Sequence, residues 1–251
     1  MAWLMVLLTL VCISLLIMAA GLFFRFIIKW LLSISQKRTS RFMKDFGQVI
    51  GFGYQATGDA TDMDSKVLCP IDPGWKVIEK VASDVLSGKI GDAPCRIYDL
   101  MVLKGSTLEA SLANRTETFY TVFELTLSRI MPDTIVTAAT GMDWLIGKIS
   151  NLIGFGGQVK LEGDFYKHFV IYVPRGVEVE AYKTFSPDVM MKLEEGAQSK
   201  VDGNELFFGQ LFFELSGNKL YIPIDGIADN MEKMSNMFEV MKFLAGIFNS
   251  K

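Results

Sequence analysis

The most apolar part of the chain is its first 35 residues, of which 28 are apolar. Residues 2–24 form a run of 23 positions without a charged side chain. A helix of that length spans about 34 Å, which exceeds the roughly 30 Å hydrocarbon core of a bilayer. A cleaved signal peptide is the alternative, but no basic residue precedes Arg25. We therefore predict a transmembrane anchor, continued by an interfacial helix over 26–35 that is too short to cross again.

Basic side chains follow the apolar run and predict its orientation. Six of them lie between residues 25 and 44, and no acidic residue occurs before Asp45. Segments with an excess of Lys and Arg stay on the cytoplasmic side of a membrane. We therefore expect a single-pass protein of the cell membrane, with its N-terminus outside, its main domain in the cytoplasm and its residues 2–35 in contact with membrane lipids. The membrane collar comprises Arg25, Lys29, Lys37, Arg38, Arg41 and Lys44.

Beyond the anchor, alternating and β-branched stretches predict several short strands. VEVEAYK at 177–183 alternates apolar and polar positions with period two. Ser216-Gly217-Asn218 predicts a hairpin turn, because Gly and Asn tolerate positive φ. Short links between successive strands favour antiparallel pairing. The predicted strands are 93–103, 118–129, 134–138, 159–162, 169–173, 177–183, 204–215 and 219–223.

Helices are predicted where capping residues precede apolar positions at helical spacing. Asp72-Pro73 predicts the start of a helix over 73–87, which Gly88 ends. Ser186-Pro187-Asp188 starts a second helix, which ends at Gly196. A short amphipathic helix is predicted over 141–157. The expected fold class is thus α+β, an N-terminal transmembrane helix followed by a mostly antiparallel sheet domain with packed helices.

The C-terminal segment predicts an amphipathic helix over 227–249, with apolar residues three and four positions apart. Its apolar face either packs on the sheet or binds a partner, and methionine is common at adaptable binding surfaces. The candidate interaction surface comprises Met231, Met234, Phe238 and Met241. The predicted parts of the chain are the anchor and interfacial helix over 1–35, the basic collar and Gly/Asp-rich linker over 36–72, the α+β domain over 73–226 and the C-terminal helix over 227–251.

Charge divides the chain at the same place as hydropathy. The 251 residues carry 25 basic and 28 acidic side chains, with a net charge of −3 and a mean hydropathy of +0.30. Six of the basic residues precede residue 45, so the remainder carries 19 basic against 28 acidic residues, a net charge of −9. A pI near 5.3 argues against a dedicated nucleic-acid-binding protein.

Recognisable catalytic and cofactor motifs are missing from the sequence. His168 is the single histidine, and no nucleophile elbow, zinc-protease or kinase motif accompanies it. Asp59, Asp62 and Asp64 do not have calcium-loop spacing, and the glycines near residue 155 lack the phosphate-loop pattern. We therefore predict no catalytic residues, cofactor or metal site. An enzyme is less favoured but stays open, because carboxylate-only sites leave little trace in a sequence.

A set of residues over about 88–224 resembles a family of N-terminally membrane-anchored bacterial proteins with a domain of unknown function. The resemblance implies a hydrophobic anchor followed by one α+β domain, and it brings no catalytic residues. The chain departs from the family at 202–210, where DGNELFFGQ is inserted, and in its Met-rich C-terminal helix. The residues that carry the resemblance are Leu161, Glu162, Gly163, Phe165, Phe169, Tyr172, Pro174, Glu180, Ala181, Phe185, Pro187, Asp188, Met190, Leu193, Asn218, Leu220 and Tyr221, with IYDL at 97–100 and MPDTIV at 131–136.

These observations lead to two functional hypotheses. The first is a cytoplasmic-facing interaction or scaffolding domain on a single-pass anchor, which binds a protein partner or a second copy of itself. The second is a membrane-associated enzyme or lipid-handling domain without a recognisable catalytic motif. An apolar cavity with convergent polar groups would favour the second hypothesis.

Overall fold

The computed structural model describes residues 39–63, 65, 68, 75–106, 115–139, 155–159, 161, 163, 165–198, 200–201, 204–205 and 211–249. The chain divides into two compact units, Met1–Phe42 and Met43–Lys251. The predicted anchor, the interfacial helix and the collar residues up to Arg38 lie outside the described residues. Within the described residues, no helix combines the length and the apolar character needed to cross a bilayer.

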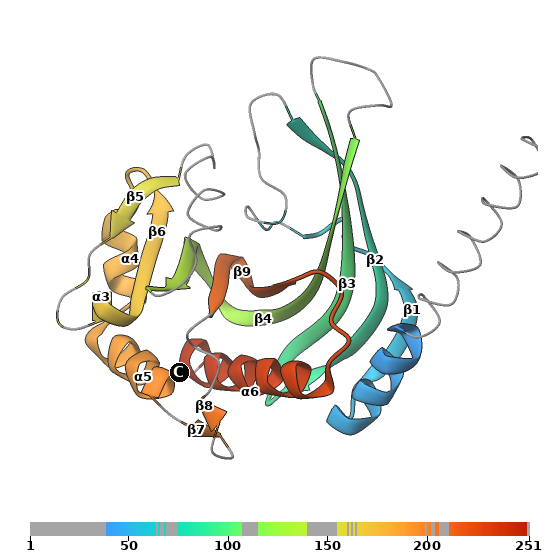
Figure 1. Ribbon diagram of the computed structural model, residues 1–251. Helices are drawn as coiled ribbons and strands as arrows, with labels where there is room; N and C mark the ends of the chain where they lie inside the picture. Colours follow the sequence, from blue (N-terminus) through green and yellow to red (C-terminus); the bar gives the residue numbers. More distant parts are fainter. Residues whose placement is uncertain are drawn as a thin grey trace, which may run out of the picture. The chain divides into compact units, whose positions relative to one another are not determined.

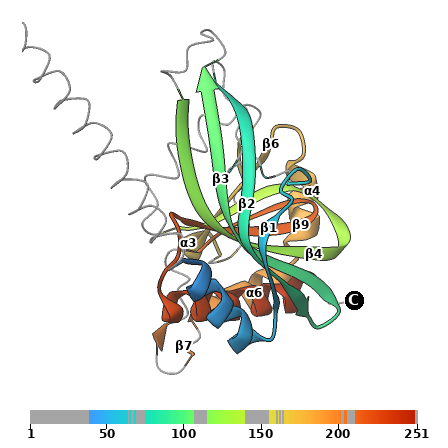
Figure 2. The same cartoon turned by 90° about the vertical axis from the view of Figure 1, so that its right-hand side faces the viewer.

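The second unit is built on an antiparallel sheet, which confirms the predicted α+β class. Within the described residues this sheet has seven strands in the order β1-β2-β3-β4-β6-β5, and β9 also pairs with β4. The long neighbours β2, β3 and β4 curve together (Figures 1 and 2). The strands are β1 Gly53–Gly58, β2 Trp75–Ile90, β3 Ala93–Ser106, β4 Arg115–Ala138, β5 Phe155–Val159, β6 Phe169–Pro174 and β9 Phe212–Asp225, with β7 Lys200–Val201 and β8 Asn204–Glu205 forming a separate pair.

Strand β4 holds the sheet together because it pairs with three other strands. Its first half lies between β3 and β9, and its second half lies between β6 and β9. The register of β4 with β9 shifts between Thr126 and Thr134, where both strands bend. The predicted strands 118–129 and 134–138 are therefore one strand. The predicted hairpin at 216–218 is wrong, because β9 continues through it with Gly217 at φ 57°.

Five helices accompany the sheet in the described part of the chain. The first covers residues 39–50, and its second half belongs to the sheet-containing unit. The helix α6 runs along one face of the sheet (Figure 1). The others are α3 Phe165–His168, α4 Glu178–Thr184, α5 Pro187–Gln198 and α6 Met231–Phe248.

Two apolar layers form, one on each face of the sheet. On one face, Tyr98, Val122 and Tyr221 are buried beneath the segment that follows β1, where Met63 and Leu68 are also buried. On the other face, Phe46 and Phe52 meet Phe238 of α6 edge to face, with ring centroids 6.4 and 5.5 Å apart. Side chains alternate between the faces of a strand, so the residues of β3 and β4 contribute to both layers.

The predicted helix over 73–87 is wrong, because residues 75–90 form strand β2. Its apolar residues fit helical spacing, but Val77, Ile78, Val81 and Val85 are β-branched and favour a strand. Pairing with β1 and β3 along its length satisfies the backbone and overrides the local signal. The capping residues Asp72 and Pro73 lie outside the described residues.

The predicted strand over 177–183 is also wrong, because Glu178–Thr184 forms helix α4. This short helix buries Ala181 and Thr184 on one side, while Val179 is 67% exposed. A segment of seven residues is too short for the pattern of apolar positions to distinguish a strand from a helix. Glu178 and Glu180 lie in the first turn, where the positive end of the helix dipole favours acidic side chains.

The remaining predictions are largely confirmed. Strands 93–103 and 169–173 appear as β3 and β6, and the helix after Ser186 appears as α5. The C-terminal helix appears as α6 but starts at Met231, after Asn230 caps it by accepting a hydrogen bond from the Lys233 amide. Of the predicted helix 141–157, residues 155–157 lie in β5 and the rest lies outside the described residues.

Candidate functional site

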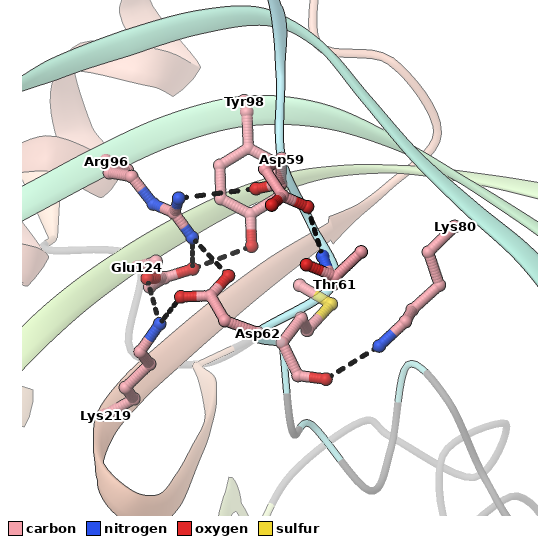
Figure 3. A network of polar contacts seen from close by, with 9 residues as sticks. Asp59, Thr61, Asp62, Lys80, Arg96, Tyr98, Glu124 and Lys219 are labelled. Atoms are coloured by element: carbon pink, nitrogen blue, oxygen red, sulfur yellow. Dashed lines mark hydrogen bonds and ion pairs between the residues drawn. The ribbon is translucent and has the colours of Figure 1, made fainter.

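A network of four charged side chains and a tyrosine joins β3, β4 and β9 to the segment that follows β1 (Figure 3). At its centre is Glu124 of β4, whose side chain is 3% exposed. Glu124 accepts hydrogen bonds of 2.9 Å from Arg96 of β3, from Lys219 of β9 and from the Tyr98 hydroxyl. Arg96 stands directly across the strand pair from Glu124, so sheet register alone brings them together. Asp62 completes the network by pairing with both cations.

The segment after β1 is held to the sheet through this network. Asp62 accepts a 2.6 Å hydrogen bond from Lys219 and a 3.3 Å bond from Arg96. Asp59 accepts a bond from the Thr61 amide, which fixes the turn between them. Lys80 of β2 donates to the carbonyl oxygen of Met63 at the far end of the segment. Asp59 and Asp62 are themselves exposed, so the segment is held to the sheet from its solvent side.

The raised pKa values of Arg96 and Lys219 keep both side chains charged near neutral pH, and the raised pKa of Tyr98 keeps its hydroxyl protonated. Burial is the largest effect on Arg96 and lowers its pKa, but the hydrogen bond to Glu124 and the charges of Glu124 and Asp62 together outweigh burial and raise the pKa. Burial also lowers the pKa of Lys219, but its hydrogen bonds to Asp62 and Glu124, together with their charges, outweigh burial and raise the pKa. Burial and then the Glu124 charge raise the pKa of Tyr98. A site with these pKa values does not exchange protons near neutral pH, so the network is a structural tie between three strands and the segment after β1.

A pocket of about 620 Å³ lies next to the network residues along β3 and β4, between the β2–β3 turn, β4 and the last turns of α6. This volume is within the range of small-molecule sites, roughly 300–1,000 Å³. Apolar side chains and glycines supply most of its walls, and polar groups are placed among them. The apolar and glycine residues are Ile90, Gly91, Ala93, Pro94, Leu127, Ala245 and Gly246, and the polar ones are Asp92, Thr126, Ser128, Lys242 and Asn249.

Two glycines keep this pocket open. Gly91 has φ 59° in the two-residue turn between β2 and β3, a conformation that a residue with a Cβ rarely adopts. Gly246 lies within α6, and a Cβ built there meets no atom within 4 Å. A glycine in a helix costs about 1 kcal/mol relative to alanine. Gly246 therefore weakens the helix and leaves a flat, unfilled wall on the pocket.

Asn249 joins the end of α6 to the strand across the pocket. Its side-chain oxygen accepts a 2.8 Å hydrogen bond from the Ser128 amide, which fixes the orientation of the amide group. Its backbone N–H donates to the Ala245 carbonyl and ends the helix. Lys242, on the same helix, pairs with Glu239 at 2.6 Å. The charged groups Lys242 and Asp92 of the pocket lining offer opposite charges to a polar head group.

The residues singled out in the sequence do not converge on one site. Met234, Phe238 and Met241 are buried, and Met231 is 37% exposed. Of the collar, Arg41 is exposed on the helix over 39–50, and Lys44 lies 4.8 Å from the centre of the Tyr54 ring. The candidate interaction surface of α6 is therefore mainly a packed core face.

No catalytic pair forms around the single histidine or the described cysteine. Within the described residues, no side-chain contact joins His168 to Cys95 or to a carboxylate, and the His168 carbonyl accepts a hydrogen bond from the Ala139 amide. Burial, and then the Glu124 charge, raises the pKa of the Cys95 thiol to about 12, so this thiol is unreactive. Cys12 and Cys69 lie outside the described residues. Among the described residues, no group of three or more metal-ligating side chains occurs.

Sequence reasoning missed Arg96, Glu124 and Lys219, and it missed the pocket. One signal was present, since Arg96 and Glu124 interrupt otherwise apolar strand segments, APCRIYDL and TVFELTL. A charged residue in the interior of a strand that is otherwise buried predicts a partner on a neighbouring strand.

Comparisons with known proteins leave the chain without an assigned family. No family model and no curated protein matches it. Among solved structures, it is similar to the mycobacterial trehalose monomycolate transport factor A, with a TM-score of 0.45 and 10% sequence identity, over 83% of this chain and 93% of that chain. A likeness at this level supports no functional inference.

Proposed function

We propose that this protein is a membrane-anchored, lipid-handling domain that binds an amphipathic molecule in the pocket at the end of α6. The single observation that carries the proposal is the pocket of about 620 Å³, whose walls combine apolar side chains with a few polar groups. An acyl chain gains about 0.8 kcal/mol for each methylene group that it buries. The charged and amide groups of the lining would hold the polar end of the same molecule.

The scaffolding hypothesis has less support from the described residues. It rested on an exposed apolar face of α6, but three of its four residues are buried. A buried side chain contributes to folding and is not available to a partner unless the helix detaches. The pocket, in contrast, is open without any rearrangement, and this difference favours the lipid-handling hypothesis.

The predicted anchor gives the proposed activity its place. A span over 2–24 followed by a basic collar would hold the domain at the cytoplasmic face of the cell membrane. A domain held there meets amphipathic molecules at the high local concentration of the bilayer. The family resemblance over about 88–224 agrees with this arrangement, because that family also places one α+β domain behind an anchor.

Filling the pocket at Gly246 should weaken ligand binding without loss of the fold. We expect Gly246→Phe to weaken binding of a pyrene-labelled long-chain fatty acid by roughly tenfold or more, since displacing two methylenes from the pocket costs about 1.6 kcal/mol. Gly246→Ala is the matched control, because its methyl group meets no atom within 4 Å. It should keep the affinity and stabilise α6 by up to about 1 kcal/mol.

The measurement is a fluorescence titration of the full chain in lipid nanodiscs, with empty nanodiscs subtracted to remove partitioning. Thermal unfolding of each variant separates a blocked pocket from a damaged fold. Equal affinities for the wild type and a folded Gly246→Phe variant would rule out this pocket as the binding site.

A further inference from the structure

Two buried carboxylates lie on the α6 side of the sheet, apart from both the Glu124 network and the pocket. Asp84 occupies the bulge where the register of β2 with β3 shifts, between Ser83 and Leu86. It has φ 51°, and it is the one non-glycine residue with positive φ in the described part of the chain. Asp84 is 8% exposed and accepts a 2.5 Å hydrogen bond from the Tyr54 hydroxyl. Such conformations persist only where surrounding contacts hold them, and they gather at functional positions.

Asp99 is the second carboxylate, on the neighbouring strand β3. It stands opposite Ser83, is 3% exposed, and accepts a 2.7 Å hydrogen bond from the Thr121 hydroxyl through Oδ1. Its other oxygen, Oδ2, is buried and has no hydrogen-bond partner among the described residues. A buried ionised oxygen without a donor is strongly disfavoured.

A short relay joins Asp99 to the start of α6. The Thr121 hydroxyl donates to Asp99, and its oxygen accepts a 2.8 Å hydrogen bond from the Ala228 amide. Ala228 lies in the segment between β9 and α6, and Gly226 in the same segment donates to the Phe119 carbonyl. The charge state of Asp99 therefore acts on the bond that holds this segment to the sheet.

Among the described residues, no basic side chain compensates the two acids. The polar groups that contact them are Tyr54 of β1, Thr121 of β4 and, through Thr121, the Ala228 amide. Lys44 of the helix over 39–50 lies over the Tyr54 ring, and no basic side chain in the described residues pairs with either carboxylate. Burial first, and then the charge of Asp84, raises the pKa of Asp99 to about 7, against the lowering effect of the Thr121 hydrogen bond.

We propose that Asp84 and Asp99 form a proton-binding site whose occupancy controls how firmly residues 226–230 and the first turn of α6 are held on the sheet. With one proton bound, Asp99 is neutral, and its buried Oδ2 carries no unpaired charge while the segment stays closed. When the proton leaves to solvent, Oδ2 becomes an ionised oxygen without a donor. Water then reaches it by opening of residues 227–230, which lead into α6, form neither strand nor helix and are joined to Asp99 through Thr121. This inference is independent of ligand binding in the pocket.

The direction of the pH effect follows from the raised pKa. The ordinary pKa of an aspartate is 3.8, and that of Asp99 in the closed state is about 7. At a pH between these two values, Asp99 binds a proton in the closed state and releases it in the opened, hydrated state. The proton on Asp99 stabilises the closed state of the segment fully at the lower end of this pH range, and this stabilisation is lost as the pH rises through about 7. Opening of the segment should increase roughly tenfold per pH unit in this range and level off above it.

Amide hydrogen exchange of the full chain in nanodiscs tests the proposal, followed by mass spectrometry of peptides over 226–240 from about pH 5 to pH 9. After correction for intrinsic exchange rates, we expect protection to fall up to about pH 7 and then stay level. Asp99→Asn should remove the pH dependence and keep the segment protected. Asp84→Asn should lower the pH at which protection stops falling, which we call the break, because the charge that raises the pKa of Asp99 is gone.

Asp84→Asn also keeps the test decisive if Asp99→Asn fails to fold, since asparagine readily adopts the positive φ at this position. The matched control is Asp225→Asn, which removes an exposed acid next to the same segment and should leave the profile unchanged. A wild-type profile without a break, or a break that persists unchanged in Asp99→Asn or in Asp84→Asn, would overturn the proposal.

Discussion

Replacing Glu124 with alanine is expected to lower the free energy of unfolding by about 3–5 kcal/mol, the usual loss when one partner of a buried ion pair is removed. Glu124 is the shared acceptor of Arg96, Lys219 and Tyr98 on three neighbouring positions of the sheet. Without it, two cations that are 29% and 17% exposed repel each other, and Asp62, itself 55% exposed, is the one acidic partner left to them among the described residues. The segment after β1 should loosen as a consequence.

Chemical denaturation of the full chain in detergent, followed by far-UV circular dichroism, measures this loss. Glu117→Ala is the matched control, because Glu117 is exposed on the same strand. A surface substitution of this kind changes stability by less than about 0.5 kcal/mol. If the two variants unfolded at the same denaturant concentration, Glu124 would not tie the strands together.

Phe238→Ala should have a loss of comparable size, about 3–5 kcal/mol, because it empties the space between α6 and the segments before β1. The Phe238 ring is 9% exposed and meets Phe46 and Phe52 edge to face. Such pairs add to the free energy of burial. Met231, on the same helix, is 37% exposed, and Met231→Ala should cost under about 1 kcal/mol.

Thermal unfolding of the two variants distinguishes a core face from an interaction surface on α6. A core face predicts a large loss of stability for Phe238→Ala and a small one for Met231→Ala. The opposite pattern, with both variants as stable as the wild type and defective in self-association, would restore the interaction surface that the sequence suggested.

The sequence predicted elements whose signal is local. The apolar run at 169–173 and the cap at Ser186-Pro187-Asp188 are each signals from neighbouring residues, and β6 and α5 appear where they were expected. Local signals failed where tertiary pairing decides the outcome. Residues 75–90 fit a helical spacing but lie between two strands, and residues 177–183 fit a strand but gain more by burying Ala181 as a helix.

The candidate sites were beyond sequence reasoning because their parts are far apart in the chain. Arg96 and Glu124 are 28 residues apart, and Glu124 and Lys219 are 95 residues apart. The pocket joins the β2–β3 turn to the end of α6, about which the sequence carries no pairing signal. Only the strand register and the docking of α6 bring these residues together.

Photo-crosslinking locates the ligand of the proposed lipid-handling domain. The full chain in nanodiscs is irradiated with a diazirine-labelled long-chain fatty acid, and the modified peptides are identified by mass spectrometry. Binding in the pocket predicts labels within 90–94, 126–128 and 242–249, competed by unlabelled fatty acid and absent from the Gly246→Phe variant. Labels confined to the predicted anchor over 2–24, or spread over the surface and unaffected by the substitution, would contradict the proposed function.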